Sequence, residues 1–293
     1  MKYLKEFYFT SAGQEEDFFF QQKRTCYDSF HPFGLLPRKG LSEMSFSDIT
    51  ILYGGNGSGK TTVLNIIASK IGADRMSAYN KSNFWEDYIA FCDLEYANGQ
   101  MENKCIITSD DVFDYMLDIR QLNEGIDQKR EERFEEYMEY KYGTFKLQSI
   151  DQIEELRKSN MAKSKTQSNF VRKTLIDNVR EYSNGESAYI YFVKHIEQNG
   201  IYILDEPENS LSPEKQMELI KFIEDSVRFF GCQFIISTHS PFILSMNGAL
   251  VYDMDQDPVC VRDWHMLKNV QLYYNFFKER DEEFVIAKNK QQQ

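Results

Sequence analysis

The sequence contains few residues that break regular structure and no pattern of paired cysteines. Glycine accounts for 15 and proline for 6 of the 293 residues, whereas apolar residues make up 42%. A chain with this much apolar material can bury a core, which argues against disordered, collagen-like or linker-dominated architectures. The five cysteines are scattered and form no C-x-x-C pair, so we expect reduced, mostly buried thiols rather than a disulfide framework.

Long apolar runs and an excess of basic charge are also missing. No run approaches the ~20 apolar residues that a membrane-spanning helix requires, and the first residues, MKYLKEFYFT, do not resemble a signal peptide. The formal net charge of −12 excludes a uniformly basic nucleic-acid-binding surface, although it allows a local basic patch. These absences predict a soluble chain without a membrane span that works in the cytoplasm.

Strand-like and helix-like segments alternate in both the first and the last third of the chain. This alternation predicts an α/β fold with a largely parallel sheet that helices cover, together with antiparallel strands near the N-terminus. Residues 21–47 are predicted to be irregular because prolines and glycines interrupt them. Strands are predicted at residues 2–9, 17–20, 48–53, 88–95, 101–108, 201–204, 233–237 and 250–253, and helices at 62–71, 186–198, 213–228 and 267–278.

The middle of the chain has a different composition and is predicted to be helical. Residues 109–181 are highly charged, lack proline and contain two glycines. Acidic residues predominate in the first part of this segment, whereas residues 157–180 carry seven basic residues and one acidic residue. We therefore predict one domain, residues 1–293, with a helical insertion at about 109–181. The basic stretch is either a contact site for DNA or an ordinary solvated helix face.

A glycine-rich segment follows the strand predicted at residues 48–53 and precedes the helix predicted at 62–71. It fits the pattern G-x-x-x-x-G-K-[ST], and this strand–loop–helix context is typical of a phosphate-binding P-loop. Glycines let the backbone curl so that N–H groups point at phosphate oxygens, and the helix N-terminus adds partial positive charge. We expect Lys60 to reach the β- and γ-phosphates and Thr61 to ligate Mg²⁺. The segment consists of Gly54, Gly55, Asn56, Gly57, Ser58, Gly59, Lys60, Thr61 and Thr62.

Two acidic residues follow the apolar strand predicted at residues 201–204. Asp205 comes at the end of this buried strand, where a carboxylate can join the ligand shell of Mg²⁺. Glu206 is one residue further along and is expected to point to the other side of the strand end. There it can act on the attacking water as a general base or as a positioning group. Two acids after an apolar run are common in proteins. Because a P-loop precedes this pair in the sequence, we interpret it as part of a nucleotide site.

Two further polar segments contribute to the pattern. Ser183 and Gly185 precede a predicted helix, where they could form an anion site or merely an ordinary turn with a helix cap. His239 follows the strand predicted at residues 233–237. From there it could bond the γ-phosphate and sense its loss, although a single histidine at a strand end often has only a structural part.

The order of these motifs resembles the ABC ATPase superfamily, and in particular its soluble SMC/RecF/OLD-like branch of small predicted ATPases. The resemblance covers both ends of the chain, and no motif in residues 109–181 contributes to it. It implies an ABC-type P-loop NTPase head that binds ATP and Mg²⁺. It also implies that Ser183 and Gly185 contact the γ-phosphate bound to a partner subunit, so that a homodimer encloses two ATP molecules head to tail. Residues 208–212 would form the D-loop, and His239 would be the switch histidine.

The sequence departs from the family pattern at several positions. The signature segment reads SNGES instead of the transporter-like LSGGQ, which points away from importers and exporters. No glutamine can be assigned to the Q-loop, and the alternatives there are Gln100, Gln121, Ser109 and Asp110. The aromatic residue that stacks on adenine also stays open, with five candidates: Phe18, Phe19, Phe20, Tyr27 and Phe30.

The combined pattern predicts an ATP-hydrolysing switch in which Lys60, Glu206 and His239 are the catalytic residues. Hydrolysis would open the ATP-bound dimer and thereby regulate a partner, such as an effector protein subunit, in DNA metabolism or anti-phage defence. One alternative is the ATPase subunit of a transporter. Another is an ATP-dependent assembly module with negligible turnover. A phosphotransferase is disfavoured, because the signature and switch-histidine segments would then have no purpose.

Overall fold

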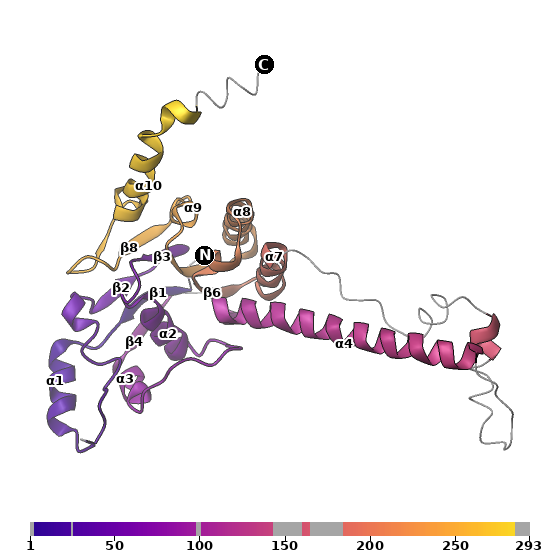
Figure 1. The fold of residues 1–293 in the computed structure, drawn as a ribbon. Helices are drawn as coiled ribbons and strands as arrows, with labels where there is room; N and C mark the ends of the chain where they lie inside the picture. The colour runs from indigo at the N-terminus through magenta and orange to yellow at the C-terminus, as the bar shows by residue number, and fades with distance from the viewer. Residues whose placement is uncertain (1–2, 25, 98–100, 143–159, 165–183, 285–293) are drawn as a thin grey trace. The chain divides into compact units, whose positions relative to one another are not determined.

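The computed structural model describes residues 3–24, 26–97, 101–142, 160–164 and 184–284 of the chain. Contacts divide the chain into two compact units. Unit 1 comprises Met1–Val112 and Asn184–Gln293, and unit 2 comprises Phe113–Ser183. Unit 1 therefore contains the elements from both ends of the chain, and it carries all the motifs described above except Ser183 (Figure 1).

A six-stranded sheet forms the centre of unit 1. Its strands are β3 (Ile49–Tyr53), β5 (Asn103–Thr108), β6 (Gly200–Asp205), β7 (Gln233–Thr238), β8 (Leu250–Asp253) and β9 (Cys260–Val261). The strand order is β5-β6-β7-β3-β8-β9, and every neighbouring pair is parallel except β8 and β9. Because β6, β7 and β3 are parallel neighbours, their carboxyl ends meet at one edge of the sheet, where α/β proteins bind their ligands.

Among the described helices, four lie around this sheet: two of them contact its strands, and the other two pack against α8. They are α2 (Lys60–Ile71), α7 (Asn184–His195), α8 (Pro213–Phe230) and α9 (Pro241–Leu244). Helix α2 contacts β5, β6 and β7, whereas α8 contacts β7, α7 and α9. Every residue of β3 and of β7 is buried, as expected for parallel strands that helices cover. The predicted α/β fold with a largely parallel sheet is confirmed.

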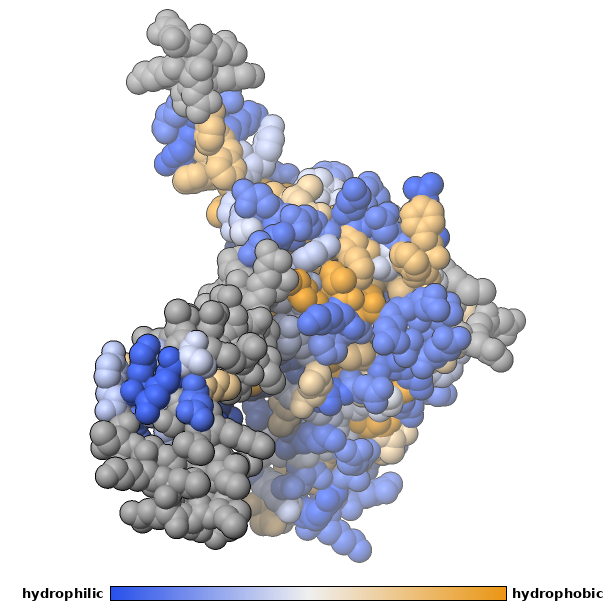
Figure 2. Space-filling model, turned by 90° about the vertical axis from the view of Figure 1, so that its right-hand side faces the viewer, coloured by the Kyte–Doolittle hydropathy of each residue, from blue (hydrophilic) through white to orange (hydrophobic). Residues whose placement is uncertain are grey.

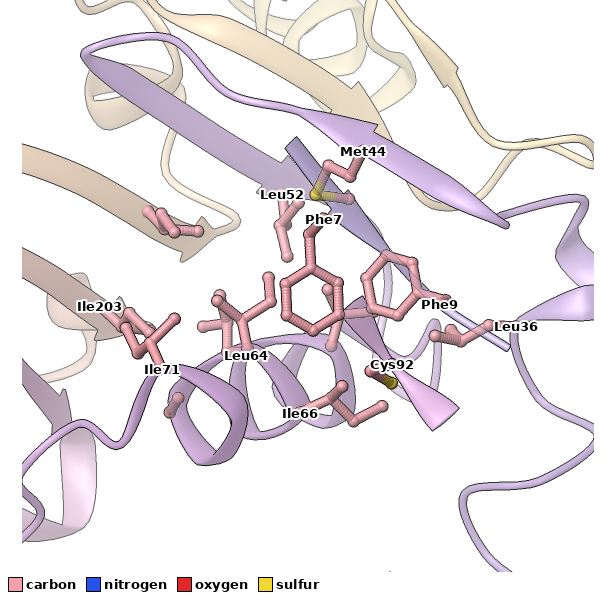
Figure 3. Close-up of a cluster of buried hydrophobic side chains, with 14 of the residues drawn as sticks. Phe7, Phe9, Leu36, Met44, Leu52, Leu64, Ile66, Ile71, Cys92 and Ile203 are labelled. Atoms are coloured by element: carbon pink, nitrogen blue, oxygen red, sulfur yellow. The ribbon is translucent and has the colours of Figure 1, made fainter. Parts of the chain in front are cut away.

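A second, antiparallel sheet lies in the N-terminal part of unit 1. It consists of β1 (Leu4–Tyr8), β2 (Glu43–Ser45) and β4 (Asp93–Tyr96), in the order β2-β1-β4. Figure 3 shows Phe7 from β1 and Met44 from β2 directed toward Leu64 of α2, and all three side chains are fully or almost fully buried. The main core of unit 1 thus joins the antiparallel strands to the P-loop helix.

One prediction for the first third of the chain is wrong, and a second is only partly correct. The strand predicted at residues 17–20 is part of helix α1 (Ala12–Gln21). Ser11 starts this helix with a capping box, in which its hydroxyl accepts from the N–H of Gln14 and the Gln14 side chain accepts from the N–H of Ser11. The aromatic run had suggested a strand, but Phe18 instead packs one face of the helix against Phe33, with ring centroids 4.2 Å apart.

The strand predicted at residues 88–95 is only partly correct. Residues 88–91 belong to helix α3 (Trp85–Phe91), and only Asp93–Tyr96 forms strand β4. Acidic residues in the first turn of α3 favour a helix, and its Tyr88 is fully buried. The segment at 21–47, predicted to be irregular, contains the short strand β2 and a 3₁₀ turn, η1 (Pro37–Lys39).

Unit 2 contains most of the long helix α4 (Ser109–Tyr142), whose first residues belong to unit 1. The helix starts at Thr108 and Asp111, whose side chains bond each other's backbone N–H groups as in a capping box. At its other end Tyr137 and Ala162 form a small buried cluster with partly buried neighbours. The described residues 109–142 are helical, and the helical insertion at about 109–181 in a single domain stays a prediction. The basic stretch at 157–180 lies outside the described residues, except for positions 160–164.

Helix α10 (Lys268–Lys278) is the last helix of unit 1, and it follows the short turn η4 (Trp264–Met266). All its residues from Gln271 onward are exposed, including several aromatic ones. Figure 2 shows their apolar side chains as a light orange group at the base of the grey C-terminal residues. Within the described ranges, no helix is both long and apolar enough to cross a membrane.

Candidate active site

The candidate site lies at the edge of the central sheet where β3, β7 and β6 end. The P-loop follows β3, His239 follows β7, and Asp205 and Glu206 end β6. These segments are far apart in the sequence, and the parallel order β6-β7-β3 makes them neighbours. The strand order therefore brings together the side chains that the sequence predicted to form one site, namely Asp205, Glu206, His239 and Lys60.

The P-loop has the backbone shape that its glycines allow. Gly57 and Gly59 have φ angles of 80° and 95°, a region that disfavours residues with a Cβ atom. At Gly54 the reason is space, because a Cβ atom would lie 2.6 Å from Ser58 Oγ. The hydroxyl oxygen of Ser58 is buried and has no hydrogen-bond partner among the described residues. The loop thus presents curled backbone and an unpaired hydroxyl, which suits binding of an anion.

Lys60 is buried within this loop, with only 4% of its surface exposed. Its Nζ atom donates hydrogen bonds to the carbonyl oxygen of Gly54 at 2.7 Å and of Gly55 at 3.3 Å. A buried ammonium group is costly unless several acceptors or an opposite charge surround it. The loop's own carbonyl groups supply part of that compensation, and Glu206 supplies the rest.

Glu206, His239 and Lys60 form a compact charged cluster. Glu206 Oε1 lies 3.0 Å from His239 Nε2 and 3.5 Å from Lys60 Nζ. His239 Nε2 also lies 3.0 Å from Lys60 Nζ. A single ring nitrogen can accept from the ammonium group or donate to the carboxylate, but it cannot do both. The protonation of this nitrogen therefore decides which of its two neighbours His239 binds.

Glu206 itself has a left-handed backbone conformation, with φ 50° and ψ 56°. Such a conformation is uncommon for a residue other than glycine and is typical of functional sites. It is held by Ser237, whose carbonyl oxygen accepts from the Glu206 N–H at 3.1 Å. The side chain of Asn209 donates to Glu206 Oε2, also at 3.1 Å. Burial raises the pKa of this carboxyl, but Asn209 and the charges of Lys60 and His239 outweigh it and lower the pKa overall.

Asp205 has different partners and the opposite pKa shift. Its Oδ1 atom accepts hydrogen bonds from the hydroxyl groups of Thr61, at 3.3 Å, and Ser237. Burial raises the pKa of the Asp205 carboxyl above its ordinary value, against the lowering effect of these two hydrogen bonds. The two neighbouring acids thus have different surroundings: Glu206 lies beside Lys60 and His239, whereas Asp205 accepts from hydroxyl groups.

The chemistry of these groups fits ATP with Mg²⁺. A cavity of about 390 Å³ is lined by the P-loop residues 56–62, by His31 and Leu35, and by Glu206. The hydroxyl of Thr61 and the carboxylate of Asp205 lie side by side, and Mg²⁺ prefers such oxygen ligands, usually one or two from the protein. Among the described residues, no cluster of three histidine, cysteine or acidic side chains suits a metal held by protein ligands alone.

A second cavity, of about 530 Å³, shares His31, Thr61 and Thr62 with the first. Its wall contains Asp205 together with Ser109 and Asp110, two of the four Q-loop candidates. Of the other two candidates, Gln100 lies outside the described residues, and Gln121 belongs to unit 2.

Arg75, which sequence reasoning missed, also lines this second cavity. Its guanidinium group lies 3.9 Å from the centre of the Tyr79 ring and donates to the side chain of Asn65. No motif surrounds Arg75 in the sequence that could have identified it.

The other predicted site residues have mixed outcomes. Gly185 lies at the start of α7, where a Cβ atom would be 3.6 Å from the carbonyl oxygen of Ser210. The signature segment therefore lies next to the expected D-loop. Ser183 is outside the described residues.

None of the five aromatic candidates for adenine stacking lines the phosphate cavity. Phe18 stacks on Phe33, Phe30 stacks on Phe84, and Tyr27 packs edge-on against Phe84. These rings contribute to the packing of the N-terminal part, whereas His31 and Leu35 are the N-terminal residues at the cavity.

Sequence reasoning assigned Glu208 and Asn209 to the expected D-loop without predicting their contacts, and it missed Asp255. Asn209 and Glu208 follow the catalytic-site acids on η3 (Pro207–Ser210), and Glu208 accepts from the backbone N–H of His239 at 2.6 Å. Asp255 follows β8, and its carboxylate accepts from the N–H of Gly55 at 2.8 and 3.0 Å. The D-loop position identified Glu208 and Asn209 but not what they bind, and nothing in the sequence pattern identifies Asp255.

The α/β fold, with a P-loop between β3 and α2, is that of the P-loop NTPase class. The family model for the ABC transporter family matches residues 42–209, which is more than half of the chain, and the chain belongs to this family. A second model, for an AAA ATPase domain, matches residues 186–244. Both matched ranges include part of the edge at which the P-loop, Glu206 and His239 meet. No curated protein sequence matches the chain.

Several solved structures have a similar fold. The SMC head domain from Thermotoga maritima has 12% sequence identity and a TM-score of 0.39, over 90% of this chain and 99% of that one. An Smc head domain from Pyrococcus furiosus, bound to the C-terminal domain of ScpA, has 12% identity and a TM-score of 0.39, over 96% of this chain and 100% of that one. A nucleotide-free ATP-binding cassette from an ABC transporter has 15% identity and a TM-score of 0.37, over 73% and 81%.

Proposed function

We propose that this chain is an ATP-hydrolysing switch of the soluble SMC/RecF/OLD-like branch of ABC-type ATPases. The observation that carries the proposal is the cluster of Glu206, His239 and Lys60, with Glu206 Oε1 at 3.0 Å from the histidine and 3.5 Å from the lysine. In this proposal the whole chain is one ATPase domain of the cytoplasm, in which unit 2 is a helical insertion. The signature SNGES, unlike that of transporters, supports the soluble branch.

Each residue has a separate part in hydrolysis. The P-loop N–H groups and Lys60 bind the phosphates, while Thr61 and Asp205 hold Mg²⁺, which neutralises phosphate charge when bound. Phosphate oxygens compete with the Glu206 carboxylate for Lys60, and this competition frees Glu206. The carboxylate then accepts the proton of the water that attacks the γ-phosphorus, and ADP and phosphate leave. The ring nitrogen of His239 that contacts Glu206 also bonds the γ-phosphate. His239 thereby senses the loss of this phosphate.

The switch itself is a dimer that forms head to tail around two ATP molecules. Ser183 and Gly185 of one subunit complete the phosphate site of the other, so loss of the γ-phosphate opens the dimer. The position of Gly185 beside Ser210, in the expected D-loop, supports a common surface for these segments. Opening then changes the contacts of a partner, which we propose to be an effector subunit in DNA metabolism or anti-phage defence.

Two features support a partner but do not identify it. The exposed aromatic side chains of α10 form an apolar surface of the kind that marks interaction sites. The basic stretch at 157–180 supports contact with DNA by its charge alone. A transporter subunit and an assembly module with negligible turnover remain the alternatives, and each predicts a different result in the experiment below.

The test uses the Glu206→Gln variant, which should bind ATP but hydrolyse it about 100-fold or more slowly. Light scattering should show a monomer without nucleotide and a dimer with ATP and Mg²⁺, and the variant should stay dimeric while the wild type reverts. Unchanged hydrolysis would contradict the role of Glu206. Negligible turnover of the wild-type protein, together with ATP-dependent dimers, would favour the assembly module.

The partner is sought by isolating the ATP-bound Glu206→Gln protein from its host, with a nuclease-treated control. A co-purifying effector subunit or nucleic acid would support the soluble switch. A co-purifying permease would replace it with the transporter subunit.

A further inference from the structure

Glu208 makes an unusual set of contacts beside the proposed catalytic cluster. A single oxygen of its carboxylate, Oε1, accepts three hydrogen bonds from consecutive residues at the end of β7. The donors are the hydroxyl of Thr238 at 2.7 Å, the N–H of His239 at 2.6 Å and the N–H of Ser240 at 3.1 Å. Hydrogen bonds to an ionised acceptor are roughly twice as strong as those between neutral groups. Glu208 therefore fixes the backbone at the end of β7.

The second oxygen of the same carboxylate makes no such contact. Oε2 is buried and has no hydrogen-bond partner among the described residues. Burying a polar atom without a partner costs free energy, so packing alone would not favour a glutamate here. The observation indicates that the position of the loop after β7 matters more than the local stability of this side chain.

The fixed loop carries His239, whose backbone is held from both sides. Glu208 accepts from its N–H, and the side chain of Asn269 in α10 donates to its carbonyl oxygen at 3.0 Å. With both backbone groups held, the imidazole of His239 lies 3.0 Å from Glu206. The next residue along η3, Asn209, donates to the other oxygen of Glu206 at 3.1 Å. Two consecutive residues of η3 thus hold the two members of the Glu206–His239 pair.

We propose that Glu208 is a positioning residue that sets His239 against Glu206 and thereby controls the rate of the hydrolytic step. The inference rests on the proposed ATPase function. It predicts that a movement of η3, which belongs to the expected D-loop, displaces His239 and Glu206 together. Glu208 acts through His239 and not by touching the nucleotide.

The kinetic test compares Glu208→Ala with Glu208→Gln, which keeps an oxygen acceptor without the charge. Glu208→Ala should lower kcat for ATP hydrolysis at least about tenfold, because small misplacements of catalytic groups have large effects on rate. The KM for ATP and the Kd measured by equilibrium binding should stay within about twofold, since neither depends on His239 alone. Glu208→Gln should recover most of kcat. Glu86→Ala is the control, as its side chain is 78% exposed.

A double variant separates positioning from a general structural effect. Glu208→Ala should slow hydrolysis no further in a chain that already carries His239→Ala, because the two residues act through the same contact. An additional loss of about tenfold in that background would overturn the proposal. So would an unchanged kcat accompanied by a lowered melting temperature, since Glu208 would then only stabilise the fold.

A spectroscopic measurement tests the positioning of His239 by Glu208 without measuring ATP hydrolysis. The chain has only four histidines, so the ¹⁵N signals of the His239 ring can be assigned readily. Glu208→Ala should shift these signals, whereas Glu208→Gln should leave them near their wild-type positions. If the wild-type chain does not hydrolyse ATP but the shift occurs, the proposed function fails and the positioning role holds. If hydrolysis occurs but neither the signals nor kcat respond to Glu208→Ala, the positioning role fails alone.

Discussion

The two halves of the candidate site are built in different ways. The P-loop after β3 is formed by consecutive residues, and its shape depends on backbone angles at Gly57 and Gly59. The opposite half, after β6 and β7, consists of side chains that hold one another, such as Glu208 with His239 and Asn209 with Glu206. The first half is a local backbone structure, whereas the second depends on the register of two strands. We therefore expect substitutions in the first half to weaken binding of nucleotide, and those in the second to alter turnover.

The largest effect should come from Lys60, which belongs to the P-loop but contacts the second half. Lys60→Ala removes the buried ammonium group near Glu206 Oε1. Nucleotide binding should be lost, and ATP hydrolysis should fall at least about 100-fold, because preorganised charge is a large contribution to catalysis. Lys81→Ala is a matched control, since Lys81 pairs with Glu86 at the surface. Retention of normal binding by Lys60→Ala would contradict the phosphate site.

A smaller effect, confined to binding, is expected from the backbone of the P-loop. In Gly57→Ala the new methyl group would meet no atom within 4 Å, so only the φ angle of 80° opposes it. That strain is about 1–2 kcal/mol, which corresponds to roughly 5–30-fold weaker binding of ATP. Gly125→Ala, where φ is not positive and space is open, is the control and should bind ATP normally. A loss of kcat without a loss of affinity would show that the comparison between the two halves is wrong.

Asp255 provides a side-chain acceptor for a backbone N–H group at the start of the P-loop. Asp255→Ala removes the acceptor of the Gly55 N–H. Affinity for ATP should fall about fivefold, in line with the net contribution of one hydrogen bond. Asp255→Asn keeps an oxygen acceptor and should bind ATP almost as well as the wild type. Equal losses in the two variants would assign the effect to charge and not to the hydrogen bond.

The smallest effect should be on stability, at Asp205. The pKa of Asp205 is raised in the folded chain, so the folded state loses stability as the pH rises from the unfolded-state pKa through the folded-state pKa. Asp205→Asn should therefore be more stable than the wild type at pH 8, by about 1 kcal/mol, although it should not hydrolyse ATP. The difference should disappear below about pH 3, where the carboxyl is protonated in both the folded and the unfolded state.

Thermal unfolding of both forms at several pH values, without nucleotide, checks this prediction. Asp17→Asn is the control, because Asp17 is exposed. A variant less stable than the wild type at pH 8 would show that the hydrogen bonds from Thr61 and Ser237 outweigh burial.

The correct strand predictions and the wrong one rest on the same signal, a run of apolar or aromatic residues. Strands β6 and β7 were predictable because they are continuously apolar and lie between helices. Residues 17–20 have a similar run of aromatic side chains, yet the capping box at Ser11 makes them a helix. A short apolar run fits either structure by its pattern, so the local start signal and the packing partner decide.

By itself the sequence determined the fold class, the P-loop and the candidate residues Lys60, Asp205, Glu206 and His239. It could do so because a phosphate-binding loop needs glycines at short, regular spacing, and a buried parallel strand needs an uninterrupted apolar run. Only the tertiary structure decided that Glu208 holds His239 and that Asp255 caps Gly55. Such contacts join segments that are about 30 and 200 residues apart. They depend on strand order and register, which leave no periodic pattern in the chain.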